Sequence, residues 1–234
     1  CKNARINSAP RLLNVLAELS GIFWDVVGFS ETRAASGDEI LTGGHRLIAS
    51  ADQEFKHLGA AILLHARLAD KVTKVRKFSG RHVLVDVDGH CGQHFRTVRC
   101  YAPHAGYSRA DLDGFFDGLR TLLAEPTTRN RHLVLVGDFN AVLHAGLRGD
   151  LLSSFVSEHG LETANSDDMD WDLQWTFENS LGHKRKIDDI LHSRSLSVSR
   201  AAATDELDCG SDHRAVHASF LLPASPKERP LRKT

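Results

Sequence analysis

Cysteine is scarce in this chain, and its few cysteines never stand close together. The four are Cys1, Cys91, Cys100 and Cys209, and none of them forms a C-x-x-C motif. Zinc sites and redox centres use such closely spaced pairs, so the sequence favours free thiols in a reducing compartment. One alternative stays open at this point, which is a disulfide between Cys91 and Cys100.

Long apolar runs are absent as well. The two most apolar stretches are GIFWDVVGF, which Asp25 interrupts, and GAAILL, and both fall short of the ~18 apolar residues of a membrane span. No signal-peptide pattern follows the first residue, which is Cys1 rather than Met. We therefore expect no membrane partner, and we expect the chain to be a fragment or a processed domain of a longer protein.

The chain also lacks an excess of charge of either sign. It has 29 Lys and Arg against 30 Asp and Glu, a net charge of −1 and a pI near 7.0. A nucleic-acid partner would therefore have to bind to a local positive patch. The 234 residues, of which 41% are hydrophobic, suffice for one large domain or two small ones with a substantial core.

What the chain does contain is a series of short strand-like runs, with few helical patterns and no internal repeat. Helices are expected at 8–20, 108–124 and 150–160, and strands at 25–32, 45–50, 59–66, 71–78, 81–89, 94–103, from 133, and at 175–179, 186–193, 196–203 and 213–222. Asp88-Gly89 is typical of a hairpin turn. These patterns predict an α/β fold, a four-layer sandwich of two mixed β-sheets flanked by helices, over residues 1–222. The Pro-rich, basic segment 223–234 is expected to be a tail or linker.

The most informative feature is how the strand in LVLVGDFNAVL (133–143) ends. Its apolar run stops at Gly137, Asp138, Phe139 and Asn140, and these four residues could be no more than a turn. Strand alternation, however, puts Asp138 and Asn140 on the same face, side by side. The acid and the amide could therefore also be half of a site.

Other predicted strands have polar residues near their ends too. These residues are Glu31, Tyr101, Asp188, Asp212 and His213, and Asn3 stands near the start of the chain. Because ligands collect at strand ends in open sheets, these side chains could converge. Mg2+ keeps most of its waters and needs only one or two carboxylates, while a base and a cationic group suit an attacking water and a phosphate. The set indicates metal-assisted hydrolysis of a phosphodiester, without a protein nucleophile.

These residues and motifs resemble those of a known superfamily. In order and spacing, Asn3, Glu31, YAPHAG, GDFNA, WTFEN…KIDDIL and GSDHRAV are similar to the endonuclease/exonuclease/phosphatase superfamily, which includes deoxyribonuclease I and the exonuclease III-type apurinic endonucleases. The resemblance runs from Asn3 to about Leu222. More narrowly, NAR, WDVVGFSETR and GSDHRAV resemble the endonuclease domains of RTE-type non-LTR retrotransposons, in which the domain precedes a reverse transcriptase.

The resemblance implies a DNA endonuclease that depends on Mg2+, with Mn2+ able to substitute. It also implies a reverse transcriptase domain beyond this chain as a partner, and nuclear localisation. Two alternatives stay open. One is a phosphatase or RNA phosphodiesterase of the same superfamily, and the other is an inactive derivative that binds nucleic acid without cutting it.

The resemblance also implies roles at the metal and at the water. Glu31 would be the principal metal ligand, with Asn3 beside it, and Asp212 would be a further metal or water contact. Asp138 would orient or deprotonate the attacking water, and Asn140 would position the water or the phosphate.

Further roles concern the phosphate and the nucleic acid. His213 would contact the scissile phosphate, and Asp188 would hold the imidazole in the correct tautomer and charge state. Tyr101 would stabilise the transition state or the leaving group. Three more residues are expected to contact substrate, namely Trp175, Thr176 and Arg5. An acid stands at the position of Arg5 in several apurinic endonucleases, so abasic-site repair is disfavoured.

Several residues are expected to be structural. Asp188 and Asp189 alternate in the strand, so one should point inward and the other into solvent. The Lys and Arg residues of 71–81 alternate with Val and should form a solvated strand face, with a stripe for the nucleic-acid backbone as the alternative. The acids of 166–172 should lie in a solvated loop. The histidines other than His213 are expected to play no part in the site, among them His57, His65, His82 and His104.

Overall fold

The computed structural model describes residues 2–52, 55, 58–89, 92–127, 129–165 and 170–222, and of residue 3 it describes the backbone alone. Cys1, Cys91, His57, most of the acidic loop, the tail 223–234 and the side chain of Asn3 lie outside the described residues. Cys100 and Cys209 are free thiols, as the sequence indicated. None of the helices in the described part of the chain has the length and apolar character needed to cross a membrane.

Two mixed sheets form the centre of the fold. In spatial order, the first sheet contains β1 (Lys2–Asn3), β2 (Val26–Ser30), β5 (Ala60–Leu64), β4 (Arg46–Ser50) and β3 (Gly37–Ile40). The second contains β10 (Leu161–Thr163), β13 (Asp188–Ser193), β9 (His132–Asp138), β8 (His94–Tyr101), β7 (His82–Asp88) and β6 (Val72–Phe78). β1 runs parallel to β2 and β8 runs parallel to β9, whereas the other neighbours are antiparallel. The predicted mixed sheets are confirmed.

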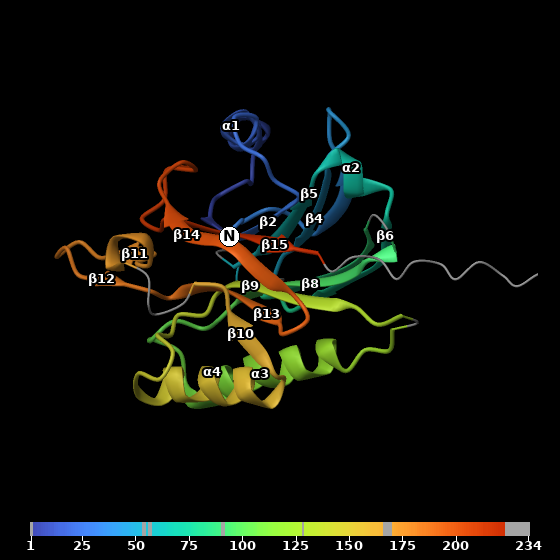
Figure 1. Ribbon diagram of the computed structural model, residues 1–234. Coiled ribbons are helices and arrows are strands. Elements are labelled where there is room, and N and C mark those ends of the chain that lie inside the picture. Colours follow the sequence, from blue (N-terminus) through green and yellow to red (C-terminus); the bar gives the residue numbers. More distant parts are fainter. Residues whose placement is uncertain are drawn as a thin grey trace, which may run out of the picture.

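Helices cover the outer faces of both sheets (Figure 1). They are α1 (Ala9–Leu19) on the first sheet and α3 (Arg109–Leu123) and α4 (Gly146–Glu158) on the second, whereas the short α2 (Ala66–Ala69) and the 3-10 turn η2 (Trp171–Leu173) lie in connecting segments. α1 packs on the first sheet through Val15 and Leu19. α3 packs on the second sheet through its Leu and Phe stripe, and Phe155 of α4 joins the same core. These contacts make the fold a four-layer α/β sandwich, as predicted.

The inner faces of the sheets meet in an aliphatic core. Ile48 and Ile62 of the first sheet pack there with Val83 and Val85 of the second. Two hairpins complete the chain, β11 (Phe177–Glu178) with β12 (Lys184–Arg185), and β14 (Ser197–Thr204) with β15 (Ala215–Leu221). The second hairpin packs against β9 and β13 through Val216. This packing places the start of β15 near the end of β9.

Several boundaries differ from the prediction, each for a local reason. α4 begins at Gly146 rather than near 150, because Gly149 allows close approach to the Val142 carbonyl, where a Cβ would come within 2.0 Å of the oxygen. The hairpin between β7 and β8 closes through a hydrogen bond from Gly89 N to Gln93 O, so its loop is longer than a two-residue turn. The predicted strand at 175–179 shrinks to the two residues of β11.

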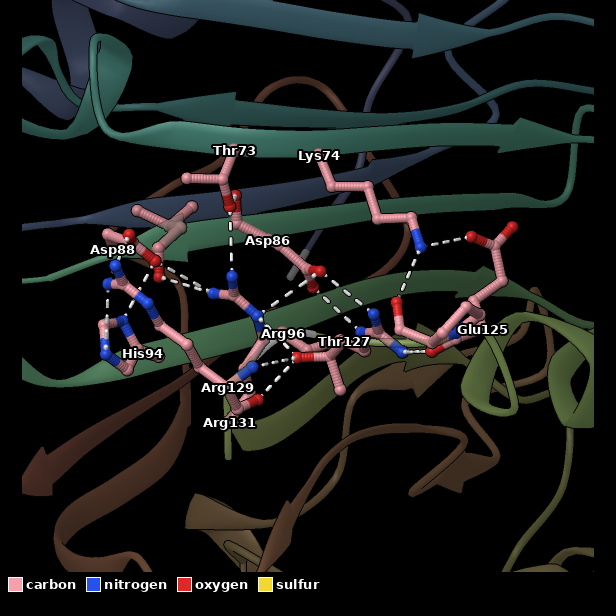
Figure 2. A network of polar contacts seen from close by, with 12 residues as sticks. Thr73, Lys74, Asp86, Asp88, His94, Arg96, Glu125, Thr127, Arg129 and Arg131 are labelled. Atoms are coloured by element: carbon pink, nitrogen blue, oxygen red, sulfur yellow. Dashed lines mark hydrogen bonds and ion pairs between the residues drawn. The ribbon is translucent and has the colours of Figure 1, made fainter.

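A buried charge network holds the far end of the second sheet together (Figure 2). Arg96 donates twice to Asp86, at 2.8 and 2.9 Å, and only 2% of Asp86 is exposed. Lys74 of the edge strand β6 forms an ion pair with Glu125, just after α3, and Arg76 joins the same carboxylate. These residues therefore tie β6 to the end of α3. Arg76 does lie on the expected solvated face of 71–81, and there it and the half-buried Lys74 also make a structural contact with Glu125.

Candidate active site

Three side chains line up across neighbouring strands at one end of the second sheet. Tyr101, the last residue of β8, is in register with Asp138 at the end of β9, and Asp138 is in register with Asp188 at the start of β13. Residues paired in this way point to the same face, about 5 Å apart. The exposed fractions are 5% for Tyr101 and 1% for each aspartate. The register thus assembles a buried row from three distant sequence segments.

His213 closes one end of this row. Its Nδ1 lies 2.7 Å from Asp188 Oδ2, and 7% of the residue is exposed. The backbone places the ring, because His213 N donates to Ser211 Oγ and the segment bridges to Phe177, whose ring centroid lies 4.9 Å away. Burial lowers the pKa of His213, but the charge and hydrogen bond of Asp188, together with nearby Asp138 and Asp212, raise it to about 9. The imidazole is therefore a cation at neutral pH.

Thr176 holds the start of β13 in place. Its Oγ1 accepts hydrogen bonds from the backbone N–H of Ile187 and of Asp188, both at 3.0 Å. The residue is completely buried, so it does not lie where a contact with nucleic acid was expected. Burial instead makes Thr176 a positioning residue for Asp188. This role was not predictable from the sequence, because a threonine after a tryptophan fits an exposed strand equally well.

Replacing Thr176 with valine is expected to cost about 2 kcal/mol of stability, because two buried N–H groups lose their acceptor. The activity of the folded protein should also fall about tenfold, since the 2.7 Å contact of Asp188 with His213 loosens. Urea unfolding and an activity assay on the same preparation would measure both effects. Thr176→Ser keeps the hydroxyl and should restore both, whereas an equal loss in Thr176→Ser would contradict this role.

Asp138 is buried beside a second carboxylate, and this changes its chemistry. Burial, followed by the charge of Asp188, raises the pKa of Asp138 to about 7, against the opposing effects of His213, the Asn140 N–H and Arg99. Asn140 N donates to Asp138 Oδ1 at 3.0 Å, so the sequence Gly-Asp-Phe-Asn does form a turn. An acid with a pKa near neutrality can both accept and release a proton at physiological pH.

Asn140 lies just beyond the strand. It adopts a left-handed conformation with φ 48°, so its side-chain direction follows from this turn and not from strand alternation. Its Nδ2 donates to the carbonyl of Ala102 at 2.9 Å. Ala102 N in turn donates to the carbonyl of Asp138 at 2.8 Å. These bonds tie the ends of β8 and β9 together beneath the carboxylate.

Glu31 reaches the row from the other sheet. It follows β2 in a left-handed conformation with φ 54°, and the hydroxyl of Tyr101 donates to its Oε1 at 3.1 Å. Burial, and then the charges of Glu31 and Asp138, raise the pKa of Tyr101 far above its usual range. Tyr101 is therefore neutral, and it bridges the acids of the two sheets. Glu31 thus lies in the site rather than in a turn remote from it.

Of the remaining predicted residues, Asn3, Asp212 and Trp175 lie next to this centre, whereas no contact among the described residues joins Arg5 to it. The backbone of Asn3 pairs with Ser30, directly beside Glu31, and Arg5 is exposed. Asp212 is exposed and lines a pocket of about 330 Å³ next to His213. Trp175 lines the same pocket, and its ring centroid lies 4.3 Å from Lys184 Nζ and 4.4 Å from Arg214 Cζ.

Sequence reasoning missed three buried charged groups. Asp189 was expected in solvent if Asp188 pointed inward, but only 5% of Asp189 is exposed, and its Oδ1 accepts from Thr163 Oγ1 at 2.6 Å. Lys2 is buried against the site, and its ammonium donates to the carbonyl of His213. Arg99 lies between the sheets with no exposed surface. Alternation indicates which face each one occupies, but not what covers that face.

The donor set fits a hard divalent cation. Asp138, Asp188 and His213 offer ligand atoms within 4.8 Å of one another, a group that could hold a metal ion. Glu31 offers a second, carboxylate-based position next to the backbone of Asn3. The carboxylate oxygens of this set are ligands of the kind that Mg2+ takes in proteins, whereas the imidazolium of His213 offers a metal no lone pair.

Comparison with known proteins agrees with this geometry. The family model described as endonuclease/exonuclease/phosphatase matches residues 3–213. The chain belongs to the endonuclease/exonuclease/phosphatase family. This family comprises, by its description, enzymes that hydrolyse phosphoester bonds.

Among curated proteins, the chain is similar to craniofacial development protein 2 of Bos taurus, with 24% identity over 254 residues. That match covers 99% of this chain but 43% of the cattle protein, so the chain spans less than half the length of the curated relatives it matches.

Two solved structures illustrate the family fold. The 3′ phosphatase NExo from Neisseria, bound to a product DNA hairpin, has a TM-score of 0.73 at 18% identity and covers 94% of this chain and 97% of its own. The endonuclease domain of TRAS1, a telomere-specific non-LTR retrotransposon, has a TM-score of 0.67 at 15% identity. The match covers 94% of this chain and 97% of the TRAS1 domain. At sequence identities this low, the structural similarity shows a shared fold and nothing more.

Proposed function

We propose that this domain is a Mg2+-dependent DNA endonuclease that nicks target DNA for a retrotransposon-type reverse transcriptase. One observation carries the proposal, namely the in-register row of Tyr101, Asp138 and Asp188, which His213 completes at one end and Glu31 at the other. The row provides a base, a cation and a metal ligand within one buried cluster. Hydrolysis of a phosphodiester by water requires these three components.

In the proposed mechanism, Asp138 accepts the proton of the attacking water. Its pKa of about 7 makes it a competent base at neutral pH, and the N–H of Asn140 holds the carboxylate in a fixed orientation. A divalent cation bound at Glu31 would polarise the phosphate and help neutralise its charge. No protein nucleophile is needed.

His213 contributes a positive charge at the scissile phosphate. Asp188 fixes the imidazolium through Nδ1 at 2.7 Å, which leaves Nε2 to donate to a phosphate oxygen. The neutral phenol of Tyr101 can donate to an oxygen of the transition state. Charge-assisted donors placed in advance in a dry site stabilise developing charge more strongly than the same groups in water.

Two comparisons and one surface feature support DNA as the substrate. NExo is described as bound to a DNA hairpin, and TRAS1 contributes an endonuclease domain from a retrotransposon. Near the site, the exposed Lys184 lies over the ring of Trp175 and pairs a positive charge with an aromatic surface, whereas Arg214 on the same ring is neutralised by Asp205 at 3.0 Å. A reverse transcriptase partner and nuclear localisation belong to the same proposal.

A phosphatase activity is the second candidate. The description of NExo as a 3′ phosphatase favours it, because a site that hydrolyses a terminal phosphate needs the same base, metal and cation. The two reactions differ in what surrounds the phosphate, and so assays on matched DNA substrates separate them. A derivative that binds nucleic acid without cutting it would be inactive in both assays.

The test is nicking of supercoiled plasmid by the purified domain, with Mg2+ and with EDTA, beside release of phosphate from a 3′-phosphorylated oligonucleotide. We expect nicked circles that require Mg2+ and are lost in Glu31→Gln. Phosphate release without nicking would replace the endonuclease by a phosphatase. A folded wild-type domain that is inactive in both assays would refute the enzymatic proposal.

The nicking rate should follow a bell-shaped dependence on pH. The base must be deprotonated, so the rate rises as pH increases through about 7, the pKa of Asp138. The cation must stay protonated, so the rate falls as pH increases through about 9, the pKa of His213. Nicking rates at fixed Mg2+ between pH 5.5 and 10 would check both limbs. A flat profile across pH 6–8 would contradict the assignment of Asp138 as base.

A further inference from the structure

Arg99 is a charged side chain with no route to water. It lies on β8 with 0% of its surface exposed, and the described residues offer no hydrogen-bond partner to Nε or to either Nη atom. An isolated charge in such a place is strongly unfavourable unless opposite charges lie near it. The question is which charges balance it.

The fold makes room for this arginine from the opposite sheet. Gly28 stands in the middle of β2, where a Cβ would come within 2.8 Å of Arg99 Cδ and 2.7 Å of Val136 Cγ2. Glycine inside a strand often marks such a close approach. The position of Arg99 therefore depends on residues of both sheets, as expected for a group with a defined place.

The charges nearest to Arg99 are those of the active site. Arg99 is in register with Val136, two residues before the row of Tyr101 and Asp138, and so it lies on the same face directly below that row. Burial lowers the pKa of Arg99, and Asp188 and Asp138 are the leading opposing influences. Asp188 Oδ1 also lacks a partner among the described residues. The guanidinium is thus the counter-charge beneath the two carboxylates.

The charges of the site are then balanced without a metal ion. Asp138 and Asp188 carry up to two negative charges, and Arg99 and protonated His213 carry two positive ones. The ammonium of Lys2, against the carbonyl of His213, lies close by as well. A divalent cation among Asp138, Asp188 and His213 would meet these cations in a medium that screens charge poorly. Glu31, by contrast, contacts the neutral phenol of Tyr101.

We propose that Arg99 acts as a built-in counter-cation that keeps divalent metal out of the Asp138–Asp188–His213 group and confines it to Glu31. The inference rests on the proposed metal-dependent function and adds the reason for the placement of the metal. It assigns a role to a residue that does not touch the substrate. Arg99 is accordingly a positioning residue, which acts through the charge of the site.

The test measures metal binding directly, by Mn2+ electron paramagnetic resonance titration of the purified domain. In the wild type we expect one Mn2+ site, which Glu31→Gln abolishes. Arg99→Met keeps the length of the side chain but removes its charge, and it should either add a second site or tighten binding at least about tenfold. In the double variant R99M/E31Q, Mn2+ binding should persist and should disappear when Asp138→Asn is added.

Two controls separate the effect of the Arg99 charge from a loss of folding. Arg99→Lys retains a positive charge and should bind Mn2+ as the wild type does, and thermal melts show that each variant is folded. Should Arg99→Met fail to fold, Arg99→Gln provides the same comparison. Unchanged Mn2+ binding in the neutral variant, with full dependence on Glu31, would overturn the proposal. Wild-type binding that requires Asp138 but not Glu31 would overturn it as well.

The same preparations separate this inference from the proposed function. If wild type nicks plasmid with Mg2+ and the Arg99 variants bind Mn2+ only through Glu31, the endonuclease stands and the role of Arg99 is wrong. If wild type neither binds Mn2+ nor cuts or dephosphorylates DNA, both proposals fail together.

Discussion

Nicking by the Asp138→Asn variant is expected to be about a thousandfold slower than by the wild type, with the fold intact. Asparagine has the shape of aspartate but cannot accept the proton of the attacking water. The side chain is 1% exposed and sits between Tyr101 and Asp188 in register, so the substitution changes charge and leaves packing nearly unchanged. Single-turnover nicking rates at saturating Mg2+ would measure the loss.

Asp138→Asn should also change how the stability of the protein depends on pH, because the pKa of Asp138 is raised in the folded state. The folded pKa of Asp138 is raised, to about 7, so the folded state holds this proton more tightly than the unfolded chain does. The contribution to stability is therefore full below about pH 4 and is lost as pH rises through 7. Asp138→Asn should remove this decline and be at least as stable as the wild type at pH 8. Urea unfolding at pH 5 and 8 would test it.

Asp189, which directly follows Asp188 on β13, provides a matched control. Asp189 is nearly as buried as Asp188 but points to the other face, where it accepts from Thr163 Oγ1 and from Ile190 N. Asp189→Asn should lose stability and keep its nicking rate per folded molecule. A thousandfold loss in Asp189→Asn as well would show that nicking is sensitive to any buried acid in this sheet, and the assignment of Asp138 would then fail.

Much of the fold was predictable because its strands carry continuous apolar runs between turn residues. β9 is the clearest case, since a Leu and Val run ends at Gly137, and the next residue is the site acid. Short elements were not predictable on the same basis. β3 has the sequence GDEI, whose acids are exposed, and it forms because the edge of β4 is there to pair with it.

The site was predictable in its members and not in its arrangement. Residues at strand ends can be listed from the sequence, but register decides which of them meet, and register depends on the neighbouring strands. Thr176 illustrates the limit. Its hydroxyl became an acceptor for two backbone N–H groups only because the turn before β13 folds over it. Arg99 illustrates another limit, since a lone arginine in a strand reads as exposed until the opposite sheet, with Gly28, is in place.

His213→Ala is expected to slow nicking by about three orders of magnitude, the usual loss when a preorganised charged donor is removed from a transition state. Truncation leaves a space beside Asp188 that has the shape of an imidazole ring. Imidazole added at millimolar concentration should therefore restore part of the rate in this variant and have no effect on Asp138→Asn. His192→Ala is the matched control, because His192 is 3% exposed on β13 but lies toward the far end of the strand from the site.

The pH dependence of stability should reveal the contact between His213 and Asp188 independently of catalysis. The folded pKa of His213 is raised to about 9, so its stabilising contribution is full below about pH 6.5 and disappears as pH rises through 9. His213→Ala removes this dependence and also leaves Asp188 buried without its cationic partner, a change that costs about 3 kcal/mol. In unfolding curves between pH 8 and 9.5, a range above the pKa of Asp138, the loss of stability should then be smaller for the variant than for the wild type. A variant as stable as the wild type at pH 6 would mean that Asp188 relies on another cation, and Arg99 would be the residue to examine.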